Sequence, residues 1–206
     1  MQHLIFDFDG VIGDTWEAAI HAYMVYGSAQ TREDAIAEMN AYFSKRHHHA
    51  RNHTLDEEQL ALEYKWASEF GAVMQQHGFS LFDAFVREIE AIDTPHKAVV
   101  SSGSQNYVLP ALARTAINPT HILAFEDHHS KEEKIERICR DWHVEPNEVY
   151  YFTDTLADVY ELRELLSPGK LIGVSWGFCS KAQLMTMLDE ENILTTPADL
   201  SRVIII

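Results

Sequence analysis

The chain has few cysteines, and it has no apolar stretch long enough to cross a membrane. Its two cysteines, Cys139 and Cys179, lie far apart and lack the spacing of a metal site. Two free thiols are typical of a reducing compartment, so we expect a cytoplasmic protein. No basic region followed by an apolar one opens the sequence, so we expect no secretory signal peptide.

Basic residues are also scarce. The 206 residues include 16 lysines and arginines against 32 aspartates and glutamates, and the formal net charge is −16. A surface this acidic repels nucleic acids and anionic membranes, and we expect neither as a partner. It repels a phosphorylated substrate too, so an anion site must be built locally from a metal ion, a lysine or helix N-termini. The sequence alone does not indicate an oligomeric state.

The pattern of apolar residues divides the chain into two parts. Residues 14–93 have the pattern of consecutive helices, whereas strands and helices alternate from Lys97 onward. The first part predicts helices over 15–27, 31–45, 54–78 and 80–92, with Thr31 as an N-cap and Thr54 and Glu57 as a capping box. The second part predicts strands over 98–102, 121–127, 148–154 and 170–176, and helices over 104–116, 130–142, 155–166 and 181–191.

Strands that alternate with helices predict an α/β fold with a doubly wound parallel sheet. The first strand, 3–9, belongs to the same sheet. Apolar residues make up 46% of the chain, which is enough for a real core. We therefore expect a Rossmann-like core domain over 1–13 and 97–206, and an inserted all-helical cap domain over 14–96.

Residues with reactive side chains follow several of the predicted strands. In open parallel sheets, ligands bind where the strands end, so these side chains should meet at one edge of the sheet. Five of them are acids or serines at strand ends: Asp7, Asp9, Ser101, Ser102 and Asp154. Asp158 lies one helical turn after Asp154, and Lys131 stands at the start of a helix.

This set of side chains suits phosphate chemistry. Clustered carboxylates repel one another unless a cation lies among them, and oxygen ligands favour a hard ion such as Mg²⁺. One carboxylate can attack phosphorus, and a second can protonate the leaving oxygen and later activate water. A lysine and a serine hydroxyl can hold the phosphoryl oxygens. A lone Asp-x-Asp pair is common on solvated turns, but the ordered combination at strand ends is much harder to obtain by chance.

Four motifs give the sequence a resemblance to the haloacid dehalogenase-like (HAD) hydrolase superfamily. The motifs are DFDGVIGDT over 7–15, a strand-terminal Ser101, Lys131 at a helix start and TDTLAD over 153–158. The later stretch LIGVSWGFCSKAQL resembles phosphoglycolate-phosphatase-like members, and β-phosphoglucomutase-like members also carry a helical cap after the first motif. The likeness runs from Met1 to about Ile204.

The resemblance implies a role for each matched residue. Asp7 is expected to be the nucleophile, and Asp9 the general acid and base as well as a Mg²⁺ ligand through its main-chain carbonyl. Ser101, Ser102 and Lys131 are expected to bind the phosphoryl group. The implied Mg²⁺ ligands are Asp7, Asp9, Asp154 and Asp158, where Asp158 is either a direct ligand or a support.

The sequence departs from the family pattern at two points. Thr153 replaces the usual glycine before Asp154, and Glu132 replaces the common proline after Lys131. Lys134 is a rival for the lysine role, although Lys131 lies four residues before the apolar Ile135, as the pattern requires. Dehalogenases of the superfamily lack an equivalent of Asp9, so the resemblance favours phosphate chemistry.

These observations predict a Mg²⁺-dependent phosphatase that acts on a small phosphomonoester through an aspartyl-phosphate. A phosphotransferase, such as a sugar-phosphate mutase, would use the same residues, and a catalytically inactive binding protein is the remaining alternative. Within the cap, the stretch KRHHHARNH over 45–53 is expected to be solvated; contact with an anionic substrate and a transition-metal site are its alternatives. Trp16 is the aromatic residue we expect to face the cleft.

Overall fold

The computed structural model describes residues 2–45 and 54–204. Its centre is a parallel six-stranded sheet with the strand order β5-β4-β1-β6-β7-β8. The strands are β1 (His3–Phe6), β4 (His96–Val100), β5 (His121–Leu123), β6 (Val149–Thr153), β7 (Leu171–Val174) and β8 (Ile193–Leu194). The sequence predicted all of them except β8, which has only two residues and therefore too short a pattern to recognise.

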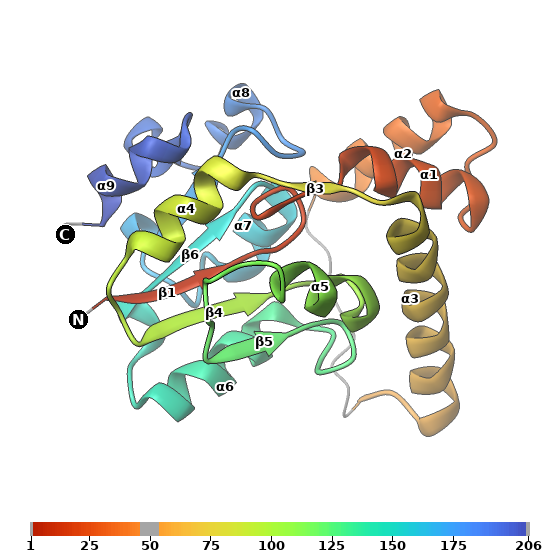
Figure 1. The fold of residues 1–206 in the computed structure, drawn as a ribbon. Helices are drawn as coiled ribbons and strands as arrows, with labels where there is room; N and C mark the ends of the chain where they lie inside the picture. The colour runs from red at the N-terminus through yellow and green to blue at the C-terminus, as the bar shows by residue number, and fades with distance from the viewer. Residues whose placement is uncertain (1, 46–53, 205–206) are drawn as a thin grey trace.

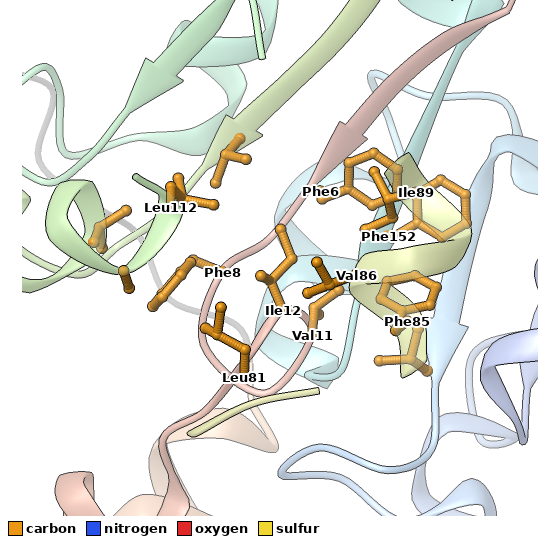
Figure 2. Packing of buried hydrophobic residues seen from close by; sticks show 14 of the residues in the cluster. Phe6, Phe8, Val11, Ile12, Leu81, Phe85, Val86, Ile89, Leu112 and Phe152 are labelled. Carbon is orange, nitrogen blue, oxygen red and sulfur yellow. The ribbon is translucent and has the colours of Figure 1, made fainter. Parts of the chain in front are cut away.

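Alternating side chains build a core on each face of the sheet. In β1, Leu4 and Phe6 join one buried cluster, whereas Ile5 between them joins the other. Figure 2 shows the first cluster around Phe6 and Phe152. The helices on the two faces are α4 (Asp83–Ala91), α5 (Gln105–Leu112) and α9 (Leu200–Val203) for the first cluster, and α6 (Lys131–Trp142), α7 (Leu156–Leu162) and α8 (Lys181–Leu184) for the second. The predicted doubly wound α/β core is confirmed.

Three further helices lie beyond the carboxyl ends of the strands, as the strand arrows in Figure 1 indicate. They are α1 (Trp16–Val25), α2 (Arg32–Phe43) and α3 (Glu57–His77). The two chain segments that lead to and from these helices pair as a short antiparallel ladder, β2 (Gly13–Asp14) with β3 (Ser80–Leu81). This arrangement holds the helical block over the sheet edge where ligands bind in such folds.

Helix α4 differs from the expected all-helical cap over 14–96. It packs on the sheet, where the Phe85 ring lies 6.0 Å from that of Phe6 and 6.4 Å from that of Phe152. The reason is its strong amphipathic pattern, which places Phe85, Val86 and Ile89 on one buried face. The division into 1–13 with 97–206 and 14–96 stays a prediction, but α4 and the β2–β3 ladder join the block to the core.

The predicted capping box at the start of α3 is wrong by two residues. Asp56, not Thr54, is the N-cap: its Oδ1 accepts a 2.8 Å bond from the Gln59 amide, and the Gln59 side chain accepts a 3.1 Å bond from the Asp56 amide. Both pairs have capping-box spacing, so spacing alone does not decide between them; in the helix that forms from Asp56, Glu57 and Glu58 lie in the first turn, where acids are favoured by the helix dipole. The Thr31 cap of α2 is confirmed.

Candidate active site

A tight loop after β1 brings two strand ends into contact. The Phe8 carbonyl accepts bonds from the amides of Ile12 (2.9 Å) and Gly13 (2.8 Å), which turns the chain sharply. Gly10 has a φ of +71°, and a Cβ on it would lie 1.9 Å from an Asp154 oxygen. Only glycine fits this position, because the loop needs both the left-handed conformation and the space. The loop thereby places Asp154, which follows β6, against the loop that carries Asp9.

Asp7 directly follows β1 as a buried acid and shares one lysine with Asp158. The Lys131 Nζ lies 2.8 Å from Asp7 Oδ2 and 2.7 Å from Asp158 Oδ2. Burial raises the pKa of Asp7 well above its usual value, although Lys131 opposes this. Burial also opposes ionisation of Asp158, but the Lys131 ammonium and the Thr153 hydroxyl outweigh it and lower the pKa of Asp158. Asp158 therefore holds the lysine, and the lysine in turn orients Asp7.

The Asp158 carboxylate finds its hydrogen-bond donors within the protein. Its Oδ2 also accepts bonds from the Tyr151 hydroxyl (3.0 Å) and the Thr153 hydroxyl (2.7 Å). Thr153, the departure from the family glycine, is thus part of the support for Asp158. With three donors on one oxygen, the geometry favours Asp158 as a support for Lys131 over a direct ligand.

Lys134, the rival lysine, contacts a different group. Its Nζ donates a 2.7 Å bond to the Ser101 carbonyl and is fully buried. Burial and the nearby Lys131 charge lower the pKa of Lys134 to about 7. Of the two lysines, Lys131 is therefore the one that reaches Asp7, and Lys134 fastens the end of β4.

Asp9 is held by two hydroxyl groups. Its Oδ2 accepts a 3.2 Å bond from Ser101 Oγ and a 2.8 Å bond from the Tyr107 hydroxyl. Burial raises the pKa of Asp9, and the hydroxyls of Tyr107 and Ser101 partly oppose the rise. Gly103 makes this contact possible, because a Cβ there would lie 1.7 Å from the Tyr107 oxygen. The arrangement gives Asp9 a fixed position and a tendency to bind a proton.

Sequence reasoning missed Tyr107. It lies in α5, where an aromatic residue on a buried face is most simply explained as core packing. Its pKa is raised well above the usual value by burial and by the Asp9 charge, so the hydroxyl stays a hydrogen-bond donor. No local pattern indicates that this hydroxyl reaches Asp9, which is 98 residues away along the chain.

We predict that Tyr107→Phe lowers kcat by about 10- to 100-fold with a small change in KM, since it removes a hydrogen bond to a charged group worth ~1.5–3 kcal/mol. The protein should remain folded, because the ring stays in the buried cluster with Phe8 and Phe79. Steady-state kinetics and thermal unfolding of both proteins measure this. An unchanged kcat would show that the Tyr107 hydroxyl does not position Asp9.

The acidic groups fit a divalent cation. Buried Oδ1 atoms of Asp9 and Asp154 have no hydrogen-bond partner among the described residues. Burial raises the pKa of Asp154 to about 8, and a 2.6 Å bond from the Phe178 amide opposes the rise. No group of three or more His, Cys, Asp or Glu side chains in the described ranges is arranged for a metal ion. With Asp9 contributing a main-chain carbonyl and Asp158 acting as a support, the implied set uses the side chains of Asp7 and Asp154 alone, and its donors are all oxygen atoms.

A cavity of about 760 Å³ opens above these groups. Asp7, Asp9, Ser102, Lys131 and Asp158 line its floor, whereas the fully buried Ser101 and Asp154 do not line it. The expectation for Trp16 is wrong: its ring packs 5.2 Å from Phe178, and Trp66 lines the cavity in its place. Nearly all of the basic stretch over 45–53 lies outside the described residues.

The sequence was compared with models of known protein families. The model for haloacid dehalogenase-like hydrolases matches residues 4–161, which is more than half of the chain. The chain belongs to the haloacid dehalogenase-like hydrolases. A comparison with curated proteins finds no match. Every helix in the described ranges is too short or too polar to cross a lipid bilayer.

Several solved structures have the same fold as this HAD-like hydrolase. A predicted phosphoglycolate phosphatase from Haemophilus somnus superimposes with a TM-score of 0.65 at 15% identity, over 98% of this chain and 97% of that one. A HAD-like family protein from Streptococcus pneumoniae gives 0.66 at 14% identity, over 98% and 97% of the two chains. A predicted β-phosphoglucomutase from Thermotoga maritima gives 0.62 at 19% identity, over 98% of each chain. At these identities the likeness concerns the fold alone.

Proposed function

We propose that this HAD-like hydrolase is a Mg²⁺-dependent phosphatase that hydrolyses a small phosphomonoester through an aspartyl-phosphate on Asp7. The observation that carries the proposal is the second acid, Asp9. It lines the same cavity as Asp7 and is held by the hydroxyls of Ser101 and Tyr107. A carboxyl group fixed beside a carboxylate nucleophile is what a leaving alcohol needs as a proton donor.

In the first step, an Asp7 carboxylate oxygen attacks the phosphorus of the ester. The bond between phosphorus and the ester oxygen breaks, and Asp9 gives its proton to that oxygen as the alcohol leaves. Burial raises the pKa of Asp9, which supports a protonated carboxyl group at the start of this step.

In the second step, Asp9 has become a carboxylate and takes a proton from a water molecule. The water oxygen attacks phosphorus, and the bond from phosphorus to Asp7 breaks. Phosphate leaves, while Asp7 is again a carboxylate and Asp9 again carries a proton. The two hydroxyls on Asp9 Oδ2 stabilise its ionised form between the steps.

Lys131 orients Asp7 and offers positive charge to the phosphoryl oxygens. Its position is fixed, because Asp158 holds it from the other side at 2.7 Å. Ser102 lines the cavity and supplies a further hydroxyl donor, whereas Ser101 acts through Asp9 and Gly103, to which it is bonded.

Mg²⁺ would be held by the carboxylates of Asp7 and Asp154 and by the Asp9 carbonyl. When bound, it supplies charge neutralisation for the phosphoryl group and for the clustered acids. The unpartnered Asp154 oxygen supports this assignment. The excess of acidic over basic residues, 32 against 16, supports a partner that is a small metabolite rather than a nucleic acid or an anionic membrane.

The test is hydrolysis of p-nitrophenyl phosphate by the purified chain. We expect release of phosphate that requires added Mg²⁺ and that stops when a chelator removes it. Asp154→Asn should raise the Mg²⁺ concentration needed for half-maximal activity by at least about tenfold, because it removes one charged ligand. Full activity in a chelator would contradict the metal assignment, and inactivity toward every ester tried would favour the binding-protein alternative.

A further inference from the structure

The cavity has two chemically different walls. Its floor carries the acids and Lys131, whereas the side formed by α1, α2 and α3 is mainly apolar and aromatic. Six cap side chains give this wall its character: Tyr23, Phe43, Leu62, Trp66, Phe70 and Met74. Four of them lie at intervals of four residues along α3, at positions 62, 66, 70 and 74, and thus form one stripe on the face toward the cavity. We call this the cap wall.

The aromatic rings of the cap wall are ordered before any ligand binds. The Trp66 and Phe70 rings are stacked at 5.1 Å with an angle of 23° between their planes. Tyr23 meets Phe70 edge-on at 5.3 Å, and the Phe43 ring packs directly on that of Phe178 at 4.9 Å. A wall with fixed rings binds apolar groups at a low cost in side-chain entropy.

Part of this apolar surface remains open to water. Leu62 is 61% exposed and Trp66 is 44% exposed, although both line the cavity. Large apolar groups gathered at one concave site mark a place where a ligand is buried. An apolar group that entered the cavity would cover the parts of both side chains that line it.

The described part of the cap wall offers no countercharge to an anionic leaving group. Lys131 is the only lysine or arginine among the described lining residues, and Asp7 and Asp158 already hold it. Among the described cap residues that line the cavity, the charged one is Glu63, an acid. A carboxylate or a second phosphate near this wall would lose its hydration without gaining a cationic partner from the described lining residues.

We infer that the substrate is a phosphomonoester whose leaving group is uncharged and apolar, such as an alkyl or arylalkyl alcohol that packs on the cap wall. This inference rests on the proposed phosphatase function and adds the substrate class. The reaction releases phosphate and an uncharged alcohol, and the cap wall holds the carbon chain of that alcohol. A cavity of about 760 Å³ has room for a leaving group much larger than glycolate.

Three phosphate esters of primary alcohols test the inference. They are ethyl phosphate, hexyl phosphate and a hexyl phosphate whose chain ends in a carboxylate. We expect kcat/KM for hexyl phosphate to exceed that for ethyl phosphate by about 100-fold, because four further methylene groups are buried. The terminal carboxylate should remove most of this gain. Equal rates for the three esters, or a preference for the carboxylate-ended ester, would overturn the inference.

Two variants test whether the preference for hexyl phosphate arises from the cap wall. Trp66→Ala should lower kcat/KM for hexyl phosphate by about tenfold more than for ethyl phosphate, because it removes a large part of the cap wall. Met185→Ala is the matched control, since Met185 is 47% exposed and does not line the cavity, and it should change neither value. Equal loss for both esters in Trp66→Ala would also overturn the inference.

The assay separates this inference from the proposed function. Hydrolysis of all three esters without an apolar preference would leave the phosphatase proposal intact and remove the substrate class. Failure to hydrolyse any of the esters or p-nitrophenyl phosphate in Mg²⁺ would remove both.

Discussion

Replacing Asp7 with asparagine should lower kcat by at least about 10⁴-fold without destabilising the protein. The amide keeps the shape of the side chain but cannot form a bond to phosphorus that later hydrolyses. The fold should tolerate the change, because burial disfavours the Asp7 carboxylate and raises its pKa. Lys131 would keep its second partner, Asp158. Phosphate release and denaturant unfolding of the same preparations measure the two effects.

Asp83→Asn is the control for this change. It removes the same charge from an exposed position at the start of α4, away from the cavity lining. We expect kcat of the control to match that of the unmodified protein. Residual activity of Asp7→Asn within tenfold of normal would show that another group is the nucleophile.

Lys131→Met should have the largest effect on stability, a loss of about 3–5 kcal/mol in the free energy of unfolding. The side chain is 4% exposed and is bonded to two acids, so its removal leaves two buried acidic groups without their cation. Activity should be lost as well, because Asp7 loses its orientation and the phosphoryl group loses a positive charge. Urea unfolding at neutral pH measures the stability.

Two further variants separate this charge effect from packing. Adding Asp158→Asn to Lys131→Met should restore part of the lost stability, because it removes one of the two unpaired charges. Lys134→Met, three residues away on the same helix, should cost only about 1–2 kcal/mol, since Lys134 is bonded to a carbonyl and not to an acid. Equal losses in the two single variants would contradict the roles that we give to the two lysines.

The main features of the fold could be predicted from the sequence because their signals are local. The alternation of apolar strands and amphipathic helices from Lys97 onward is strong enough to place the parallel sheet. The two-residue strands β2, β3 and β8 gave no such signal, since their pairing depends on segments far along the chain. The sequence predicts α4 as part of the cap, because a helical pattern identifies a buried face but not the surface that covers it.

The site shows the same division between local and distant information. Asp7, Asp9 and Lys131 stand in motifs that the sequence displays directly, and the structure brings them to one cavity floor. The Tyr107 hydroxyl bonds to Asp9, 98 residues away, and Lys134 bonds to the carbonyl of Ser101, 33 residues away. Thr153 bonds to Asp158, only five residues away, but across the turn between β6 and α7. The cap wall could not be recognised either, because an apolar stripe on α3 is equally typical of a helix packed in a core.

Chemical trapping of the phosphorylated protein tests the central claim most directly. The chain is mixed with substrate and Mg²⁺, quenched in acid during turnover and reduced with borohydride, which converts an aspartyl-phosphate into homoserine. The account predicts homoserine at position 7 in the N-terminal peptide, and none in a sample without substrate. Turnover in Mg²⁺ with aspartate unchanged at position 7, or with homoserine at another position, would contradict the account.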